Sequence, residues 1–490
     1  MVSNMVKTAI VGSVGVAVII LSSTLGWILV PDIATSEAVI TKDNEAVYGA
    51  WTIPPVPIYL EFFLFNCTNC DDPTNGSVVL NLDQLGPFSF TEGRIKFNVI
   101  EKNGLLSYRE NISYFYTPKD GERDLDVNVT TVNPVYFTLA SLISDNAPTP
   151  AIATSLSRLM HQLLADEGEH PFMTHTVREM LFEGWSLQPY VNILELLYEQ
   201  LSNSTDSTLP PLPELPEDPK FGFFYGRNGT NLGEFTIESG ANDLNELGYI
   251  KKWNGKSSVS YWNDTFCNMI NGTDGAIYPP IVDVNEKIYV FTPDVCRSLY
   301  ATYEKDTVTE GITGRRFTVP EIVFDTLDPE NVCYCSQYSE NPDLCFSRGV
   351  LDMRPCLLGV PVVLSTPHFY MADPKYVDAF VGLKPNKDWH ETHFDLEPLL
   401  GVPLFASKRL QLNIDARRYQ VPKGLLNIND TVFPVIWLNE SAKLDASTAN
   451  DVNKAVNVID ALNISRWCFL GAGIALVVAS LIMLVVYLTR

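Results

Sequence analysis

Basic residues are scarce in this chain. The 490 residues include 34 lysines and arginines against 58 aspartates and glutamates, a formal net charge of −24. A protein that follows a nucleic-acid backbone needs clustered positive charge, and no block of basic residues occurs. We therefore expect no nucleic-acid partner. The acidic balance also opposes adsorption to anionic lipid headgroups.

The sequence also lacks the patterns of common catalytic sites. It contains no G-x-S-x-G nucleophile motif and no glycine-rich phosphate loop. In His390-Glu391-Thr392-His393 the histidines are at i and i+3, whereas the zinc-protease motif places them at i and i+4 on one helix face. Asp124 and Asp126 are too few carboxylates to indicate a calcium site. We therefore expect no enzyme activity, no metal site and no cofactor.

Charge is absent from two long stretches near the chain ends, Thr8 to Val30 and Trp467 to Leu488. At about 1.5 Å per residue, each stretch makes a helix of roughly 33 Å, which is long enough to cross a bilayer. The first stretch exceeds the apolar core of a signal peptide, about 7–15 residues, so we expect a retained anchor. The sequence thus predicts transmembrane helices at 8–30 and 467–488, with cytoplasmic residues 1–7 and 489–490.

The residues between the two anchors, 31–466, form an ectodomain rich in glycosylation sequons. Acceptor sequons mark the lumenal or extracellular side of the membrane, so both termini are cytoplasmic. The eleven predicted N-glycosylation sites are Asn66, Asn75, Asn111, Asn128, Asn203, Asn228, Asn263, Asn271, Asn429, Asn439 and Asn463.

Hydrophobic periodicity divides the ectodomain into two kinds of structure. Residues 59–66 form an aromatic run that predicts a buried strand. Residues 94–99 alternate and place Ile95, Phe97 and Val99 on one face of a strand. Leucines at helical spacing instead predict a helical insertion over about 134–203, followed by a proline-rich linker.

Cysteine usage indicates disulfides rather than zinc. Six cysteines lie within 90 residues: Cys267, Cys296, Cys333, Cys335, Cys345 and Cys356. Sequons flank the first of them, which places the cluster in an oxidising compartment, and the spacing is poor for zinc. The pairing stays open at this point. Cys67 and Cys70 form a C-x-x-C that follows a strand, so we predict a local turn disulfide rather than a redox centre.

Histidines and carboxylates are interleaved within the helical insertion. Histidine titrates near pH 6.5, and neighbouring carboxylates favour its charged form. One reading is an ordinary solvated surface, and the other is a ligand surface whose charge changes between the cell exterior and an endosome. The residues of this candidate apex ligand surface are His161, Asp166, Glu167, Glu169, His170, His175 and Glu179.

Several stretches resemble the class B scavenger receptor family. This group contains fatty acid translocase, the high-density-lipoprotein receptor, the lysosomal integral membrane protein and insect sensory neuron membrane proteins. The similarity covers nearly the whole chain, including both anchors. The matching stretches include Leu85-Gly86-Pro87-Phe88, Cys267-Asn268-Met269-Ile270-Asn271-Gly272-Thr273-Asp274, Asp294-Val295-Cys296-Arg297-Ser298, Cys333-Tyr334-Cys335, Gly382-Leu383-Lys384-Pro385-Asn386 and Ile436-Trp437-Leu438-Asn439-Glu440.

The resemblance implies an α+β fold with an antiparallel β-barrel core, an apical helical bundle and a hydrophobic tunnel. It also implies the pairs Cys267–Cys333, Cys296–Cys356 and Cys335–Cys345. The implied function is binding of lipids or lipoproteins, with transfer of fatty acids, sterols or phospholipids through the tunnel to the bilayer of the plasma membrane. One rival is a receptor in the endosomal or lysosomal membrane that carries a protein ligand at its apex and releases it in acid.

Some features depart from the family or leave alternatives open. Some members carry lysines before the helix that matches 172–182 and use them to bind anionic ligands, but here Asp166-Glu167-Gly168-Glu169 occupies that place. A two-pass ion channel would need a polar stripe along its pore helices, which the two stretches lack. The small-residue pairs Ser13/Ala17 and Gly471/Ala475 suggest helix packing instead, with a homo-oligomer as an open possibility.

Overall fold

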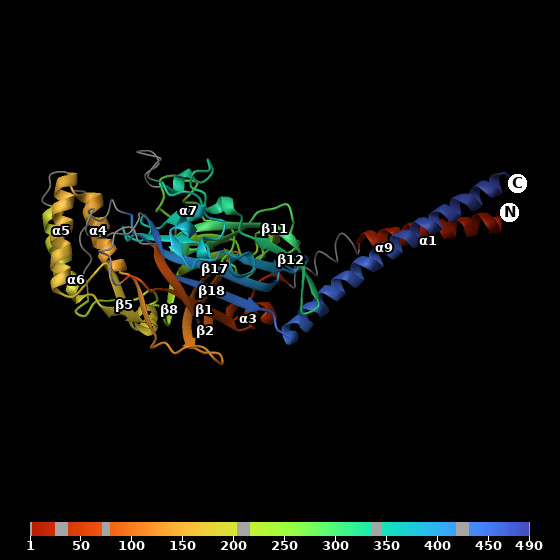
Figure 1. Cartoon of the computed structure of the whole chain (residues 1–490). Helices are drawn as coiled ribbons and strands as arrows, with labels where there is room; N and C mark the ends of the chain where they lie inside the picture. Colours follow the sequence, from red (N-terminus) through yellow and green to blue (C-terminus); the bar gives the residue numbers. More distant parts are fainter. Residues whose placement is uncertain are drawn as a thin grey trace.

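The computed structural model describes residues 2–24, 38–70, 79–202, 216–335, 345–417 and 431–489, except for the side chains of residues 2–4 and of Asn463. A large antiparallel sheet lies at the centre, with three helices at one end and two apolar helices at the other (Figure 1). Both chain termini lie at the end that carries the apolar helices. The predicted α+β class, with two terminal helices around a large antiparallel β core, is therefore confirmed.

Within the described residues the main sheet has fourteen strands, and eleven of them follow one continuous hydrogen-bonded order, β10-β11-β12-β16-β17-β18-β1-β2-β3-β8-β9. Neighbours in this order pair in antiparallel fashion. The strands are β1 (Ile58–Cys67), β2 (Leu80–Lys102), β3 (Leu105–Tyr116), β8 (Thr230–Glu238), β9 (Ile250–Trp253), β10 (Ile288–Thr292), β11 (Arg297–Thr309), β12 (Ile312–Thr318), β16 (His393–Leu396), β17 (Pro403–Asp415) and β18 (Val432–Lys443). β1 covers the aromatic run that predicts a strand.

A short segment nearly closes this sheet into a barrel. The N–H of Ile250 in β9 donates to Gly272, and the N–H of Thr273 donates to Tyr289 in β10. Phe291 in turn donates to Thr273, so residues 272–273 lie between the two edge strands. Because the sheet curves into a nearly closed barrel, each strand has one face toward the interior and one toward the outside.

Three short strands extend the main sheet beyond this order. The strand β14 (Val362–Ser365) pairs with β17 and with β13 (Val350–Asp352), while β15 (Phe380–Val381) pairs with β2. The helices α3 (Glu45–Thr52), α7 (Pro374–Asp378) and α8 (Lys387–His390) lie in the connecting segments. On the outer face of β1 and β18, Phe63 and Trp437 stack with ring centroids 3.9 Å apart.

Three helices form the apex at the end distant from the terminal helices (Figure 1). They are α4 (Pro134–Asn146), α5 (Pro150–Asp166) and α6 (Gln188–Ser202). Asn133 and Thr149 cap the first two by accepting backbone N–H groups, and a proline follows each cap at a position that needs no N–H donor.

The apex also contains strands that sequence periodicity does not predict. The strand β5 (Phe172–Thr176) pairs with β4 (Asn128–Val132), and β6 (Trp185–Ser186) pairs with β7 (Lys220–Phe221). A π-helix spans Glu179–Glu183. The family helix expected at 172–182 is therefore replaced by a strand and a π-helix, although Met180 and Leu181 are buried as expected of an apolar helical face.

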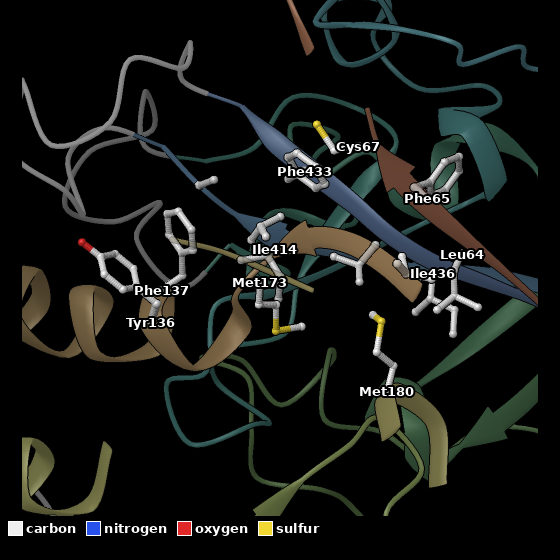
Figure 2. Packing of buried hydrophobic residues seen from close by; sticks show 14 of the residues in the cluster. Leu64, Phe65, Cys67, Tyr136, Phe137, Met173, Met180, Ile414, Phe433 and Ile436 are labelled. Carbon is white, nitrogen blue, oxygen red and sulfur yellow. The ribbon is translucent and has the colours of Figure 1, made fainter. Parts of the chain in front are cut away.

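The buried residues between barrel and apex form one continuous core. Figure 2 shows Met180 of the π-helix pointing toward Leu64 of β1 and Ile436 of β18. All three side chains are at most 1% exposed. Burying such side chains contributes about 1.5–3 kcal/mol each, so this contact stabilises the apex on the barrel.

The two terminal helices pack against each other along their length (Figure 1). α1 (Val2–Thr24) begins before the predicted span, whose residues 25–30 lie outside the described residues. α9 (Ala446–Leu488) starts in the ectodomain and continues through the second span. The chain is therefore a two-pass membrane protein.

The contact between the spanning helices uses glycines other than those expected. A Cβ on Gly15 would lie 2.9 Å from the carbonyl oxygen of Gly473, so only glycine permits this approach. Ser480 donates to the carbonyl oxygen of Thr8 at 2.9 Å. Gly471, by contrast, has nothing within 4 Å of such a Cβ. The predicted small-residue pairs therefore face away from this contact, and the homo-oligomer stays a prediction.

Four disulfides tie the ectodomain loops. The structure pairs Cys67 with Cys70, Cys267 with Cys333, Cys296 with Cys356 and Cys335 with Cys345. These are the local turn disulfide and the three pairs that the resemblance implies. Cys468 is free and exposed on α9.

Candidate functional site: the barrel interior and the apex

One stretch of a barrel strand carries charged residues inward and exposes apolar residues on the outer face. On β2, Glu92 and Lys96 share the face of Phe90 and are 9% and 3% exposed. Ile95, on the opposite face, is 50% exposed. Alternation in a strand is the same for either orientation, so the pattern predicts a strand without telling which face is the core.

The inward charges on β2 join charges from three other strands. Arg94 Nη2 lies 2.7 Å from Glu92 and 2.7 Å from Glu440 on β18. Lys408 on β17 lies 3.2 Å from Glu440. Two further contacts reach Glu110 on β3, which lies 3.5 Å from Arg94 and 2.8 Å from Lys96. We call this set the polar belt: Glu92, Arg94, Lys96, Glu110, Lys408 and Glu440.

The polar belt has equal numbers of positive and negative side chains, and a further ion pair extends it. Arg227 donates to Asp294 in a charge-assisted hydrogen bond. The Asp294 charge also acts on Lys408, so this pair lies close to the belt. Charged groups therefore reach from β17 and β18 toward the segments before β8 and β11.

Several belt side chains are surrounded by protein and yet retain accessible surface. Lys408 keeps 34% side-chain exposure and Glu440 keeps 20%. Arg94 keeps 22%. Side chains that face the interior of a barrel and remain accessible border space large enough for water. Such space lowers the cost of placing charge inside a protein, which without water or partners is several kcal/mol per ion.

The two belt carboxylates that lie 2.7 Å from Arg94 have pKa values shifted in opposite directions. Burial and the nearby Glu440 charge raise the pKa of Glu92 to about 7, against the opposing effect of Arg94. Burial opposes ionisation of Glu440 too, but Lys408 and Arg94 together overcome it and lower its pKa. Because Glu440 has two cationic partners and Glu92 shares one, Glu92 is the carboxylate that takes up a proton first.

An aromatic cluster lies between the polar belt and the apex. The ring of Phe62 on β1 lies 4.9 Å from Phe224 and 6.1 Å from Phe182 of the π-helix. Phe182 in turn packs on Phe90 and on Tyr114, at 4.9 and 5.4 Å. π-helical turns often occur at functional sites, and this one holds the ring between apex and interior.

The interior also has an apolar wall next to the belt. Leu410 of β17 pairs directly with Leu438 of β18, which pairs with Phe62 of β1. These three share the inward face of Glu440, two residues along β18. A chain of methylene groups placed here would therefore contact hydrocarbon while a polar group reached the belt.

The structure divides the predicted apex ligand surface. Asp166, Glu167 and His170 are exposed around the end of α5. Glu169 instead accepts a hydrogen bond from the Tyr190 hydroxyl, which also accepts one from Asn133. Asp166, Glu167 and His170 are therefore at the surface, whereas Glu169 stabilises the apex through its hydrogen bond to Tyr190.

Two apex histidines are held by neighbouring rings. His161 Nδ1 lies 3.0 Å from the Tyr136 hydroxyl, and burial, followed by the His170 charge, lowers its pKa. The expectation that carboxylates favour its charged form is therefore wrong for this residue. His175 stacks on Trp185 at 4.7 Å and lies 3.5 Å from Glu179.

A buried histidine pair, which sequence reasoning missed, lies on the outer face of β18. His368 and His390 stack with ring centroids 4.4 Å apart. The Nδ1 atom of each accepts a backbone N–H, from Lys384 and Asn386. Burial, with nearby positive charge, lowers the two pKa values to about 4 and about 3. His393, by contrast, lies in β16, so the two histidines of the 390–393 motif do not converge.

The sequons differ in how their side chains are engaged. The amide nitrogen of Asn439, where a glycan would attach, donates to Glu61 at 2.9 Å. Asn75, Asn203 and Asn429 lie outside the described residues, and the side chain of Asn463 on α9 is not described. Asn128, Asn228 and Asn263 are exposed, while Asn66, Asn111, Asn271 and Asn439 are half-buried.

Comparison with known proteins gives one family over nearly the whole chain. The sequence model of the CD36 family matches residues 10–484. Lysosome membrane protein 2 of Mus musculus is 33% identical over 422 residues, 85% of this chain and 81% of that protein. Scavenger receptor class B member 1 of Rattus norvegicus is 30% identical over 431 residues, 87% of this chain and 79% of that protein. Sensory neuron membrane protein 2 of Manduca sexta is 29% identical over 452 residues, 90% of this chain and 86% of that protein.

Proposed function

Because this chain belongs to the CD36 family, we propose that it binds lipid or lipoprotein ligands with its ectodomain and passes lipid through the barrel interior to the bilayer. The expected ligands are fatty acids, sterols and phospholipids. The expected location is the plasma membrane with the ectodomain outside the cell. Family membership and the two-pass topology support a membrane receptor, and the barrel interior supports the transfer step.

The observation that carries the proposal is the polar belt inside an otherwise apolar barrel. Each buried methylene group favours an apolar wall over water by about 0.8 kcal/mol, so an acyl chain would partition strongly into this interior. A polar head group would lose its hydration there unless the belt replaced those hydrogen bonds. Arg94 and Lys408 offer donors and the belt carboxylates offer acceptors.

A census of co-purifying lipids tests this proposal. The full chain, purified from expressing cells, should carry amphiphilic lipid that mass spectrometry identifies. Lys408→Met with Glu440→Met removes an inward ion pair and should deplete lipids with polar head groups. Lys119→Met with Glu61→Met removes an ion pair that lies on the outer face and should leave the lipids unchanged. Wild-type protein that carries no lipid, together with uptake on ice no higher than in untransfected cells, would contradict the proposal.

A second candidate function is transport of a protein ligand to an endosomal or lysosomal membrane. The exposed cluster of Asp166, Glu167 and His170 favours it, because it places a histidine among carboxylates at the surface, and histidine is the residue type used in pH-dependent release of ligands. A relative of similar length is named as a lysosome membrane protein. Pull-down of ligands at about pH 7 and at about pH 5 distinguishes the candidates, since only the protein carrier should release its ligand in acid.

A further inference from the structure

We propose that an N-linked glycan on Asn111 covers an apolar strip on the outer wall of the barrel. The strip consists of Ile95 and Phe97 on β2 and Phe115 on β3, which are 50%, 36% and 57% exposed. Side chains of this kind, gathered on one face of two paired strands, form a contiguous apolar surface. Such surfaces on soluble domains mark places that something covers.

The strand register places Asn111 in the middle of this strip. Asn111 pairs directly with Ile95, and the next pair along the ladder on the same face brings Arg109 opposite Phe97. Directly opposed side chains have Cβ atoms about 4.5–5.5 Å apart, and diagonal ones about 7–8 Å. On the other side, the Phe115 ring lies over Gly93, where an added Cβ would meet it at 3.2 Å. A glycan attached to Asn111 would therefore have Ile95 directly opposite it and Phe97 and Phe115 on its two sides along the strands.

The chemistry of Asn111 fits glycan attachment. Asn111-Ile112-Ser113 is an acceptor sequon on the side of the membrane where glycosylation occurs. The Asn111 side-chain oxygen is buried with no hydrogen-bond partner among the described residues, so no such bond fixes the amide to the sheet. The ring faces of N-acetylglucosamine carry C–H groups that pack on Ile95 and the two phenylalanine rings, while its hydroxyls stay in water.

Attachment at the centre of the strip favours the glycan over other occupants. A second copy of the chain or a lipid surface would have to displace a covalently attached, hydrated group. Beyond the strip, Arg109 and Glu234 form an ion pair at 3.8 Å, both 48% exposed, so the apolar surface ends at a charged border. The covered area thus matches a small sugar core rather than an extended protein interface.

The test combines occupancy with exposure of the strip on the full chain in detergent-free nanodiscs. Glycopeptide mapping should find Asn111 occupied. Ser113→Ala removes the sequon but retains the asparagine, and should raise the fluorescence of a hydrophobic-surface dye roughly twofold, because the dye binds to an uncovered apolar patch. Adding Ile95→Thr and Phe97→Thr should cancel that rise. Asn128→Gln removes an exposed sequon elsewhere and should leave the dye signal unchanged.

A second measurement applies if Ser113→Ala does not fold. Trimming the folded wild-type protein to single N-acetylglucosamine residues should leave dye binding low, while complete deglycosylation should raise it. An unoccupied Asn111 overturns the proposal. So does a dye signal that stays constant on complete removal, or a rise that Ile95→Thr with Phe97→Thr fails to cancel. Self-association of fully glycosylated protein through this face would identify a second copy as the occupant instead.

Discussion

Arg94 and Glu440 lie 346 positions apart in the sequence and 2.7 Å apart inside the barrel. The guanidinium on β2 reaches across β1 to the carboxylate on β18, and both side chains keep accessible surface there. A buried ion pair of this kind stabilises little by itself, because desolvation offsets most of the attraction. The proposed passage of lipid through the barrel gives this ion pair a role in ligand binding instead.

The first prediction concerns Glu92, whose pKa is raised to about 7 from a reference of 4.5. The protonated form is favoured in the folded state, so its stabilisation is fully present below about pH 4.5 and is lost as pH rises through 7. Glu92→Gln mimics the protonated form. We expect it to raise the melting temperature by roughly 1–3 °C at about pH 8 and to have little effect near pH 5.

Thermal unfolding of the full chain across this pH range measures the effect. Glu286→Gln, at an exposed position outside the belt, is the matched control and should show no pH-dependent gain. A melting-temperature increase for Glu92→Gln that is the same at both pH values would mean that Glu92 is ionised throughout.

The second prediction concerns His390, whose pKa is lowered to about 3. The unfolded chain takes up the proton first, so stability is lost as pH falls from about 6.5 toward the folded value. His390→Asn retains an acceptor for the Asn386 N–H and cannot titrate. At about pH 5 this effect lowers the free energy of unfolding of the wild-type protein by roughly 2 kcal/mol relative to neutral pH. The variant should not show this loss between the two pH values.

Chemical denaturation at the two pH values provides this comparison. The His390 and Glu92 effects have opposite signs between neutral and endosomal pH, so each variant is compared with wild type separately. Equal acid sensitivity of His390→Asn and wild type would contradict a neutral, buried His390.

The third prediction concerns the charge of the apex. Asp166 and Glu167 are exposed at the end of α5, where like charges oppose polyanionic ligands. Asp166→Lys with Glu167→Lys should therefore increase binding of oxidised lipoprotein. The matched control is Glu101→Lys with Glu286→Lys, which makes the same change of net charge at exposed barrel positions. If both double variants bind equally, overall charge rather than apex charge determines binding.

The sequence predicts much of the architecture for clear physical reasons. Uncharged stretches reveal membrane helices because hydrocarbon excludes charge, and leucines at helical spacing reveal the apex. Register is harder, because strand alternation fixes which residues share a face without fixing which face is inside. The apolar residues Ile95 and Phe97 would be assigned to the core by pattern alone, but Glu92 and Lys96 occupy it.

The polar belt could not be assembled from sequence because its members come from four strands. Charges at alternate positions of one strand, Glu92, Arg94 and Lys96, are the one local sign of it. The partners Lys408 and Glu440 lie over 300 residues away, and only the barrel order brings them together. The stacked pair of His368 and His390 was hidden for the same reason, since a connecting segment folds over β18.

The most direct test of lipid transfer is to block the barrel interior from one position. Leu438 faces inward between Phe62 and Leu410 and is half-buried, so Leu438→Cys presents a thiol to the interior. Ser441→Cys places the thiol on the outer face of the same strand, and Cys468→Ser removes the native free thiol from both variants. Cells on ice, where vesicle traffic stops, are treated with a bulky lipid-like thiol reagent and then given a labelled fatty acid or sterol ester. We expect uptake to fall to the level of untransfected cells for Leu438→Cys only, with surface binding unchanged. Undiminished uptake in the labelled Leu438→Cys protein would contradict transfer through the barrel.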